Sequence, residues 1–219
     1  MTIPYNAKPF SNRSYIRDAL KDKGIDIEKD ELTQTVQAVR DAMHNVVPGP
    51  MSVMKWIETE VSKIIKSGMK KPGDIVILEW ETPSGFIVVQ RLMKREMQTV
   101  RLQLLGRCEL EVAKDTDEVS LMRHKAATAP NLIHSLDASL LHLSATRFDA
   151  PIALIHDSVL CRATDMTTLS NLVRETYMDL FAKEDYLTSF AQQIGAETNP
   201  PIIGDLEPST VIDSTYFFC

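Results

Sequence analysis

A charged pair, His156-Asp157, lies between two short apolar runs, residues 152–155 and 158–161. Each run has the length and composition of a strand, and two residues are the commonest length for a hairpin loop. The sequence therefore predicts a β-hairpin over residues 152–162 with His156 and Asp157 at its turn. An Asp held there can act as a rigid ligand for a catalytic metal ion. Asp is also common in surface turns without any chemistry, because its side chain bonds to the nearby backbone.

A second pair of possible functional residues precedes the hairpin. His134 and Asp137 are three residues apart in the segment 130–147, whose pattern predicts a helix, so the two side chains share one face. Such a pair could bind a metal or relay a proton, but most such pairs are simple polar contacts. The buried face of this helix is expected to consist of leucines: Leu136, Leu140 and Leu143.

The residues around these pairs resemble motifs of the single-subunit, phage-type RNA polymerases. LIHDS at 154–158 is similar to the third polymerase motif, and APNLIHSLDASL at 129–140 is similar to a second conserved stretch. MTIPYNAKPF at 1–10 resembles the end of the second polymerase motif. GDL at 204–206 and DSTYFFC at 213–219 resemble the terminal foot. These matches occur in the family's order and correspond to roughly the last quarter of its chain.

The resemblance implies a DNA-directed RNA polymerase that transfers nucleotides from nucleoside triphosphates to the RNA 3′ end by two-metal catalysis. Asp157 would be catalytic and would bind two Mg²⁺ ions, and His156 would help to seat the RNA 3′ end. The first motif, with the other metal-binding Asp, would lie before Met1. We therefore expect the C-terminal subunit of a split enzyme, active only with a partner chain that shares the two ions.

The resemblance also implies roles in binding nucleotides and nucleic acid. Tyr5 would lie beside the ribose of the incoming nucleotide, and Phe10 would pack near the template base. His134 would reach the minor groove of the template–RNA duplex. Phe218 and the terminal carboxylate of Cys219 would fold back toward the nucleotide, although the family usually ends in a smaller residue. The expected partners are the N-terminal polymerase subunit, template DNA, RNA product and nucleoside triphosphates.

The hydrophobic pattern predicts an α+β fold. Apolar residues recur at helical spacing, and two antiparallel strand pairs follow, the first joined by a turn at Thr82-Pro83-Ser84-Gly85. The expected helices span 10–23, 31–47 and 51–68. The expected strands span 74–80, 86–90, 100–105 and 108–112, and the charged segment 114–118 is predicted to be a loop.

By resemblance, these elements would form part of a right-hand polymerase. Residues 1–24 would end the fingers helix. Residues 25–185 would form the palm with its associated helices, antiparallel strands and the catalytic hairpin at 152–162. Residues 186–219 would form the C-terminal foot.

Composition limits the class of protein. Hydrophobic residues make up 44% and charged residues 25%, which is ordinary for a globular chain, and no apolar run is long enough to span a membrane. We expect a cytoplasmic protein without membrane contacts. Three widely spaced cysteines argue against a disulfide framework or a zinc site. The net charge of −6 disfavours a nucleic-acid binder unless local basic clusters, or a partner chain, line the channel.

The basic residues that could add such local charge form three clusters. They lie at 66–71, at Lys94-Arg95 and at Arg123-His124-Lys125. A run of basic residues is also common on an ordinary solvated surface.

Two alternative functions agree with part of the sequence. The related family A DNA polymerases also have a His-Asp turn, but their motif usually continues with Glu where this chain has Ser158, and they lack an aromatic foot. RNA synthesis without a primer would separate the two. A non-catalytic polymerase remnant that only grips nucleic acid is the other alternative. It would tolerate Asp157→Asn with a change in binding alone.

Overall fold

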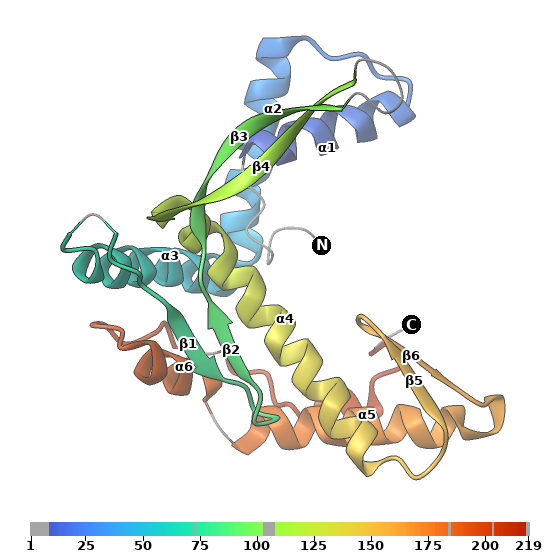
Figure 1. The fold of residues 1–219 in the computed structure, drawn as a ribbon. Coiled ribbons are helices and arrows are strands. Elements are labelled where there is room, and N and C mark those ends of the chain that lie inside the picture. Colours follow the sequence, from blue (N-terminus) through green and yellow to red (C-terminus); the bar gives the residue numbers. More distant parts are fainter. Residues whose placement is uncertain (1–8, 72, 103–107, 184, 203, 218–219) are drawn as a thin grey trace.

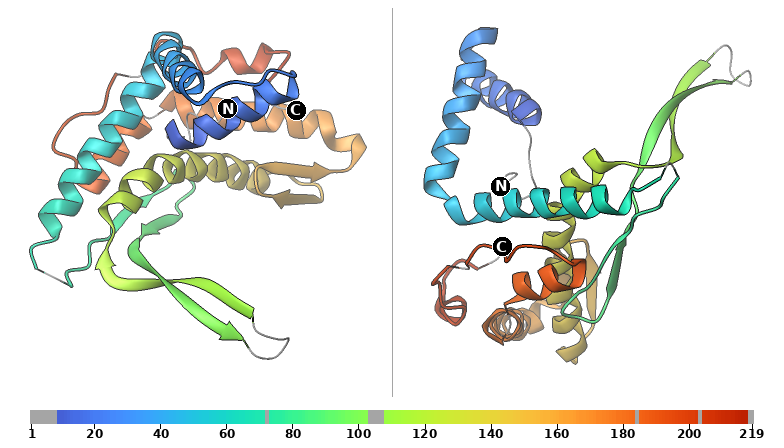
Figure 2. Two further views of the ribbon diagram at one scale, coloured as in Figure 1. Left: turned by 90° about the horizontal axis from the view of Figure 1, so that it is seen from above. Right: turned by 90° about the vertical axis from the view of Figure 1, so that its left-hand side faces the viewer.

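The computed structural model describes residues 9–71, 73–102, 108–183, 185–202 and 204–217. Figures 1 and 2 show an α+β fold, as predicted, which combines helices with three separate antiparallel strand pairs. The helices are α1 (Pro9–Asp22), α2 (Lys29–Val46), α3 (Pro48–Gly68), α4 (Leu121–Arg147), α5 (Met166–Lys183), α6 (Tyr186–Ile194) and α7 (Thr210–Asp213), with a 3-10 turn at Ala163–Asp165. The strands are β1 (Leu78–Glu81), β2 (Ile87–Gln90), β3 (Met93–Leu102), β4 (Cys108–Val119), β5 (Ile152–Ile155) and β6 (Ser158–Cys161). None of the described helices has the length and hydrophobicity needed to cross a bilayer.

The first three helices lie where the apolar periodicity predicts them. α1 packs against α2, and Arg13 Nη2 donates to the Lys29 carbonyl and the Thr33 hydroxyl, each at 2.8 Å. α3 begins at Pro48, directly after Val47. A proline at a helix start loses no hydrogen bond, because the first N–H groups of a helix have no partner inside it.

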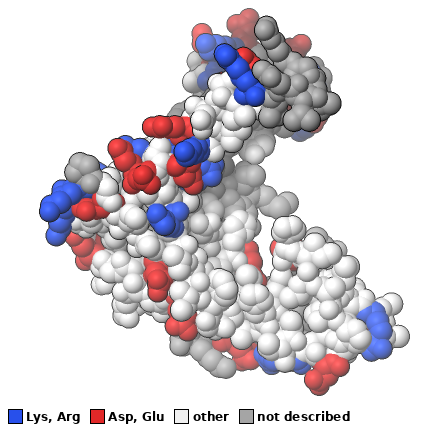
Figure 3. All heavy atoms as spheres, viewed as in Figure 1, with Lys and Arg blue, Asp and Glu red and all other residues white. Residues whose placement is uncertain are grey.

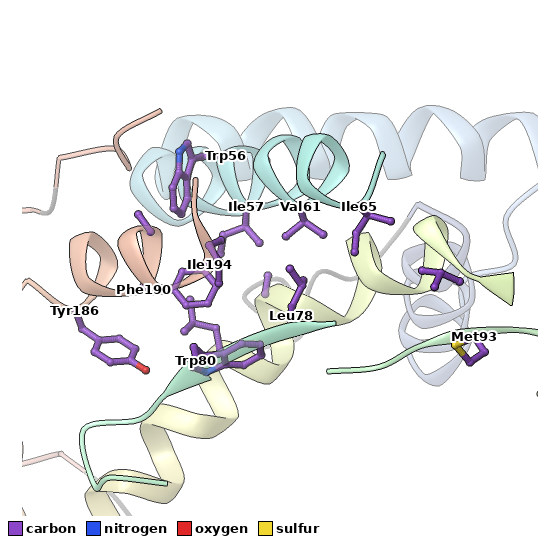
Figure 4. Close-up of a cluster of buried hydrophobic side chains, with 14 residues drawn as sticks. Trp56, Ile57, Val61, Ile65, Leu78, Trp80, Met93, Tyr186, Phe190 and Ile194 are labelled. Atoms are coloured by element: carbon purple, nitrogen blue, oxygen red, sulfur yellow. The ribbon is translucent and has the colours of Figure 1, made fainter. Parts of the chain in front are cut away.

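The main buried cluster lies where α3, β1, α4 and α6 meet (Figure 4). Ring centroids of Trp80 from β1 and Phe190 from α6 are 5.5 Å apart in an edge-to-face arrangement, and both side chains are buried. Full burial of an aliphatic or aromatic side chain stabilises a fold by about 1.5–3 kcal/mol. The other members with almost no exposed surface are Ile57, Val61, Ile65, Leu78 and Leu132. This junction fixes the position of α4, which carries several of the expected site residues.

A buried carboxylate ties the chain after α6 to α3. The Glu60 carboxylate accepts the N–H of Glu197 at 2.7 Å, the hydroxyl of Thr198 at 2.9 Å and the ammonium of Lys63 at 2.8 Å. Burial alone would raise the pKa of Glu60. The hydrogen bonds from Lys63, Glu197 and Thr198 outweigh that effect and lower its pKa to about 2. This contact anchors the start of the C-terminal segment.

α4 begins at Leu121, so the expectation of a helix start near Pro130 is wrong. Ser120 caps the helix, and its hydroxyl accepts the N–H of Arg123 at 3.3 Å. Pro130 lies inside the helix, where it removes one backbone donor. The helix continues past it because α3 packs along α4, and tertiary packing outweighs local preference.

The buried face of α4 also differs from the predicted leucine face. The leucines expected to be buried there are only partly covered: Leu136, Leu140 and Leu143. Instead Ser135, Ser139 and Ser144 are buried beside Leu132 and Leu141. The Ser135 hydroxyl donates to the Leu132 carbonyl at 2.7 Å and accepts the indole N–H of Trp80 at 3.3 Å. The serine hydroxyl therefore satisfies the indole N–H of the buried Trp80.

The first hairpin agrees with its turn sequence, and the second strand pair is longer than predicted. In the β1–β2 turn, Gly85 has φ +80° and donates its N–H to the Thr82 carbonyl at 2.8 Å. β1 begins at Leu78, later than the expected strand start at 74. β3 and β4 form a ribbon that projects from the body of the molecule (Figure 2). The segment 114–118 belongs to β4, so the predicted loop is wrong.

Charges paired across the ribbon explain that difference. Lys94 Nζ lies 2.6 Å from Glu118, and Arg95 Nε lies 3.0 Å from Asp115. Opposite charges on neighbouring strands favour the extended pairing that each charged strand would otherwise resist. A run of charges therefore indicates a loop only when no facing strand compensates it.

The chain returns to α5 after α7. Arg174 Nη1 donates to the carbonyls of Val211 and Ser214, and its guanidinium lies 5.3 Å from the ring centroid of Phe217. Phe217 also contacts Tyr177, with ring centroids 5.0 Å apart. Phe217 therefore docks the C-terminal segment on α5, whereas the neighbouring Tyr216 is 92% exposed.

Candidate functional site

The predicted hairpin is present, with His156 and Asp157 at its turn. Ile155 pairs with Ser158, so only these two residues connect β5 to β6. His156 has φ 55°, in the left-handed region, which costs a residue other than glycine about 1–2 kcal/mol. Two-residue hairpin turns use positive φ values because their twist then matches that of the strands. Backbone strain of this kind is common at functional sites, and here it lies next to the candidate metal ligand.

The charge on the hairpin turn influences α4. Partial desolvation raises the pKa of Asp137 on α4, the charge of His134 opposes this effect, and the charge of Asp157 adds to it. Figure 1 shows the β5–β6 hairpin following the C-terminal end of α4. His134 and Asp137 share one face of α4, and the carboxylate of Asp157 acts electrostatically on that face.

Asp157 fits a Mg²⁺ site in donor type but does not complete one. Carboxylate oxygens are the ligands that Mg²⁺ prefers, and the ion demands near-ideal octahedral coordination. Across the described parts of the chain, no group of three or more His, Cys, Asp or Glu side chains could hold a metal ion. Asp157, even with Asp137 nearby, supplies too few oxygens. Phosphate oxygens, water or other protein groups would have to supply the rest.

The other predicted site residues are less well defined. Phe10 lies in the first turn of α1, and its side chain is not described. Tyr5, Phe218 and Cys219 lie outside the described residues. The roles expected of these four residues stay predictions.

A groove of about 400 Å³ lies between the β1–β2 hairpin and α4, and His134 is part of its lining. The hairpin contributes Thr82, Ser84, Phe86 and Val88. α4 contributes Asn131, His134, Ser135, Ala138 and His142. Sequence reasoning identified only His134. The α4 residues share one helical face and could have been grouped by their spacing, whereas the opposite wall is brought there by tertiary packing.

In two of the basic clusters, side chains that could have contacted phosphate are paired with carboxylates or buried. Lys94 and Arg95 are paired with carboxylates of β4, as described above. His124 is fully buried, so the expectation that it contacts phosphate is wrong. Its Nε2 accepts the Leu92 N–H at 3.2 Å, and burial, with a smaller effect of the Arg123 charge, lowers the pKa of His124.

Uncharged surface surrounds much of the site. Figure 3 shows Lys and Arg side chains over the far end of α3 and the base of the ribbon. In the same view most of the surface over α4 and β5–β6 carries no charged side chain. On this face the described residues therefore offer little positive charge around the hairpin, and nucleic acid held there would need positive charge from elsewhere.

Comparison with known proteins defines the class. A family model described as DNA-dependent RNA polymerase matches residues 1–203, and the chain belongs to this family. The chain is 30% identical over 227 residues to the DNA-directed RNA polymerase of Pseudomonas phage phiKMV, and the match covers all of this chain and 27% of the phage protein. It is 31% identical over 235 residues to the mitochondrial DNA-directed RNA polymerase 1 of Arabidopsis thaliana, covering 22% of that protein. DNA-directed RNA polymerase 2A of Nicotiana tabacum is 29% identical over 232 residues, and 66% of it is covered.

These matches confirm the resemblance to the phage-type polymerases. All of this chain is covered in each of them. The chain itself spans about a quarter of the length of the phage and Arabidopsis proteins. It therefore corresponds to one part of such a polymerase.

Proposed function

We propose that this chain is the C-terminal part of a DNA-directed RNA polymerase and carries the catalytic hairpin. One observation supports this most directly: Asp157 lies at a strained two-residue turn of a hairpin, where its carboxylate acts electrostatically on Asp137 of α4, on the helical face that also carries His134. In this proposal residues 1–24 end the fingers helix, 25–185 form the palm and 186–219 form the foot. The polymerase works in the cytoplasm of its host cell.

The reaction joins the RNA 3′ end to an incoming nucleotide. The 3′-hydroxyl oxygen attacks the α-phosphorus, its proton passes to solvent, the bond to the β-phosphate breaks, and pyrophosphate leaves. Asp157 is the residue of this chain that would hold Mg²⁺, which when bound lowers the pKa of the attacking hydroxyl and stabilises the leaving pyrophosphate. His156 helps to seat the 3′ end, and His134 contacts the minor groove of the template–RNA duplex.

Residues near the chain ends would bind the nucleotide and the template. Tyr5 lies beside the ribose of the incoming nucleotide, and Phe10 packs near the template base. Phe218 and the carboxylate of Cys219 support the nucleotide from the other end of the chain. These assignments follow the family motifs that the sequence resembles.

A partner chain completes the proposed site. It supplies the other catalytic Asp, the Arg and Lys of the fingers helix, and most of the positive lining of the nucleic-acid channel. Two features support this need: Asp157 lacks a full set of metal ligands among the described residues, and the chain has a net charge of −6. The two Mg²⁺ ions would be shared between the chains.

Reconstitution with Asp157→Asn tests the proposal. We expect the 219-residue chain alone to give no template-dependent incorporation, and the partner chain to restore it. Asp157→Asn should lower the rate on the order of a hundredfold or more, because it removes a ligand that acts in the transition state. Asp149→Asn, in the exposed loop before β5, should keep the wild-type rate. Near-normal turnover of Asp157→Asn in Mg²⁺ would refute the assignment.

A further inference from the structure

The groove beside α4 extends beyond the contact that the proposed function assigns to His134. His142 lies eight residues after His134 on the same face, about 12 Å along the helix axis. Asp137 lies on the other side of His134 around the helix. His134 therefore stands between Asp137 and the rest of the groove. A strand that contacts His134, as the proposed function requires, can continue directly into the groove.

Polar groups inside the groove are already ordered by one another. Ser84 Oγ lies 3.1 Å from Thr82 Oγ1, 3.3 Å from Ser139 Oγ and 3.4 Å from His142 Nδ1. Ser84 therefore orients the His142 ring from the side of Nδ1. Nε2 has no hydrogen-bond partner in the parts of the chain that the structure describes. It is left to contact a ligand in the groove.

The opposite wall supplies an exposed aromatic surface. Phe86, directly after the β1–β2 turn, is 62% exposed although it lines the groove. None of the lining residues is acidic, in a chain with 30 Asp and Glu residues, so nothing in the lining repels a phosphate backbone. An aromatic face combined with neutral hydrogen-bonding groups suits a nucleic-acid strand, which presents sugars and bases for packing and oxygens for hydrogen bonds.

We propose, building on the polymerase function above, that this groove binds the sugar–phosphate backbone of one strand of the template–RNA duplex. His142 Nε2 contacts a phosphate or ribose oxygen, and Phe86 packs on a sugar or base of the same strand. At about 3.4 Å per base pair, the distance from His134 to His142 spans roughly three to four steps of a duplex that follows the helix. The groove thus holds the duplex a few base pairs away from the position of Asp157.

Binding of an RNA–DNA hybrid to the full 219-residue chain, measured alone and together with the partner chain, tests this site directly. A fluorescently labelled hybrid is titrated without nucleoside triphosphates, at fixed salt and pH. His142→Ala should weaken binding about three- to tenfold, the size expected for one hydrogen bond. Phe86→Ala should weaken it at least about fivefold, as for one stacking contact. His142→Gln, which keeps a side-chain donor, should retain most of the binding.

An exposed histidine elsewhere provides the matched control. His44→Ala on α2 removes an exposed imidazole that does not line the groove and should bind as wild type does. A photoreactive base placed in the hybrid should cross-link to residues 84–86 when it lies three or four pairs from the RNA 3′ end. All of these substitutions are at exposed positions, and unchanged melting temperatures verify that the variants fold.

The outcomes separate this proposal from the polymerase assignment. If the wild-type chain binds no hybrid even with the partner chain present, or if His142→Ala and Phe86→Ala both bind as tightly as wild type, the groove proposal is wrong even when the reconstituted enzyme incorporates nucleotides. If binding depends on His142 and Phe86 while no partner restores incorporation, the groove is supported and the polymerase assignment fails.

Discussion

The junction of α3, β1, α4 and α6 and the β5–β6 hairpin use similar apolar residues in opposite ways. At the junction, Trp80 and Phe190 are almost completely enclosed by neighbouring helices. On the hairpin, Ile155 and Leu160 are 55% and 56% exposed. Both regions are rich in apolar residues. Only the junction is stabilised by burying those residues within this chain.

The junction stabilises the fold, whereas the hairpin carries the candidate catalytic residue. The junction holds α4 in place, and α4 carries His134 and Asp137 on one of its faces. The hairpin contributes the strained turn and Asp157 and adds little to the packing of the chain. Exposed apolar strands are costly for an isolated protein, so their presence agrees with a surface that the proposed partner chain covers.

The largest expected effect is at the centre of the junction. Phe190→Ala should lower the free energy of unfolding of the chain by about 3–5 kcal/mol, because it removes a buried ring and leaves a cavity beside Trp80. Phe86→Ala, at an exposed phenylalanine, should change it by less than about 0.5 kcal/mol. Chemical denaturation of both variants measures the contrast. Equal losses would show that the junction is not the main source of stability.

The buried carboxylate of α3 should give the next effect. Glu60→Gln removes charge-assisted hydrogen bonds to residues 197–198 and should cost about 1.5–3 kcal/mol at pH 7. The pKa of Glu60 falls from an ordinary 4.5 to about 2 on folding. Its contribution is therefore complete above about pH 4.5 and is lost as the pH falls toward 2.

The free energy of unfolding, measured at pH 7 and at pH 3, tests whether the contribution of Glu60 decreases on acidification. The difference between wild type and Glu60→Gln should shrink at the lower pH. Glu79→Gln, an exposed carboxylate on β1, should show neither the loss nor the pH dependence. A difference that grows on acidification would contradict the assignment of a depressed pKa.

Local signals predicted the hairpins and the first helices well. The turn at His156-Asp157 is encoded by two flanking apolar runs, and the β1–β2 turn by Pro83 and Gly85, so neighbouring residues suffice. The serine-lined face of α4 was missed because its burial depends on β1, more than fifty residues earlier in the chain. The groove was missed for the same reason.

The resemblance to family motifs identified candidate site residues that hydrophobic periodicity does not identify. His134 and Asp157 were singled out by their family context, and in the folded chain the charges of both act on Asp137. His142 and Phe86 carry no motif and become visible only when α4 and the β1–β2 turn are seen together. Likewise, residues 114–118 can be predicted as a strand only when the oppositely charged residues of β3 are known to face them.

A smaller effect is expected where the C-terminal segment docks on α5. Phe217→Ala should lower the free energy of unfolding by about 1–2 kcal/mol, since the ring loses its contacts with Tyr177 and with the Arg174 guanidinium. Tyr216→Ala should have almost no effect, because that side chain is 92% exposed. Thermal or chemical unfolding of the two variants measures how much each of these neighbouring aromatic side chains contributes to stability. Equal effects would mean that Phe217 does not hold the tail.

The smallest effect on stability is expected at the hairpin itself. Leu160→Ser should change the free energy of unfolding of the isolated chain by less than about 0.5 kcal/mol, because the side chain is already 56% exposed. The same substitution should weaken association with the proposed partner chain, since it places a hydroxyl where apolar surface is to be covered.

Leu206→Ser provides the control for this comparison. Leu206 is 75% exposed, lies outside the hairpin and should affect neither quantity. Unfolding of the isolated chain and titration of the partner chain give the two measurements separately. A loss of several kcal/mol in the isolated chain would show that the hairpin is part of the stabilising core. Unchanged association would show that the partner does not cover this face, and the contrast between the two regions would then need another cause.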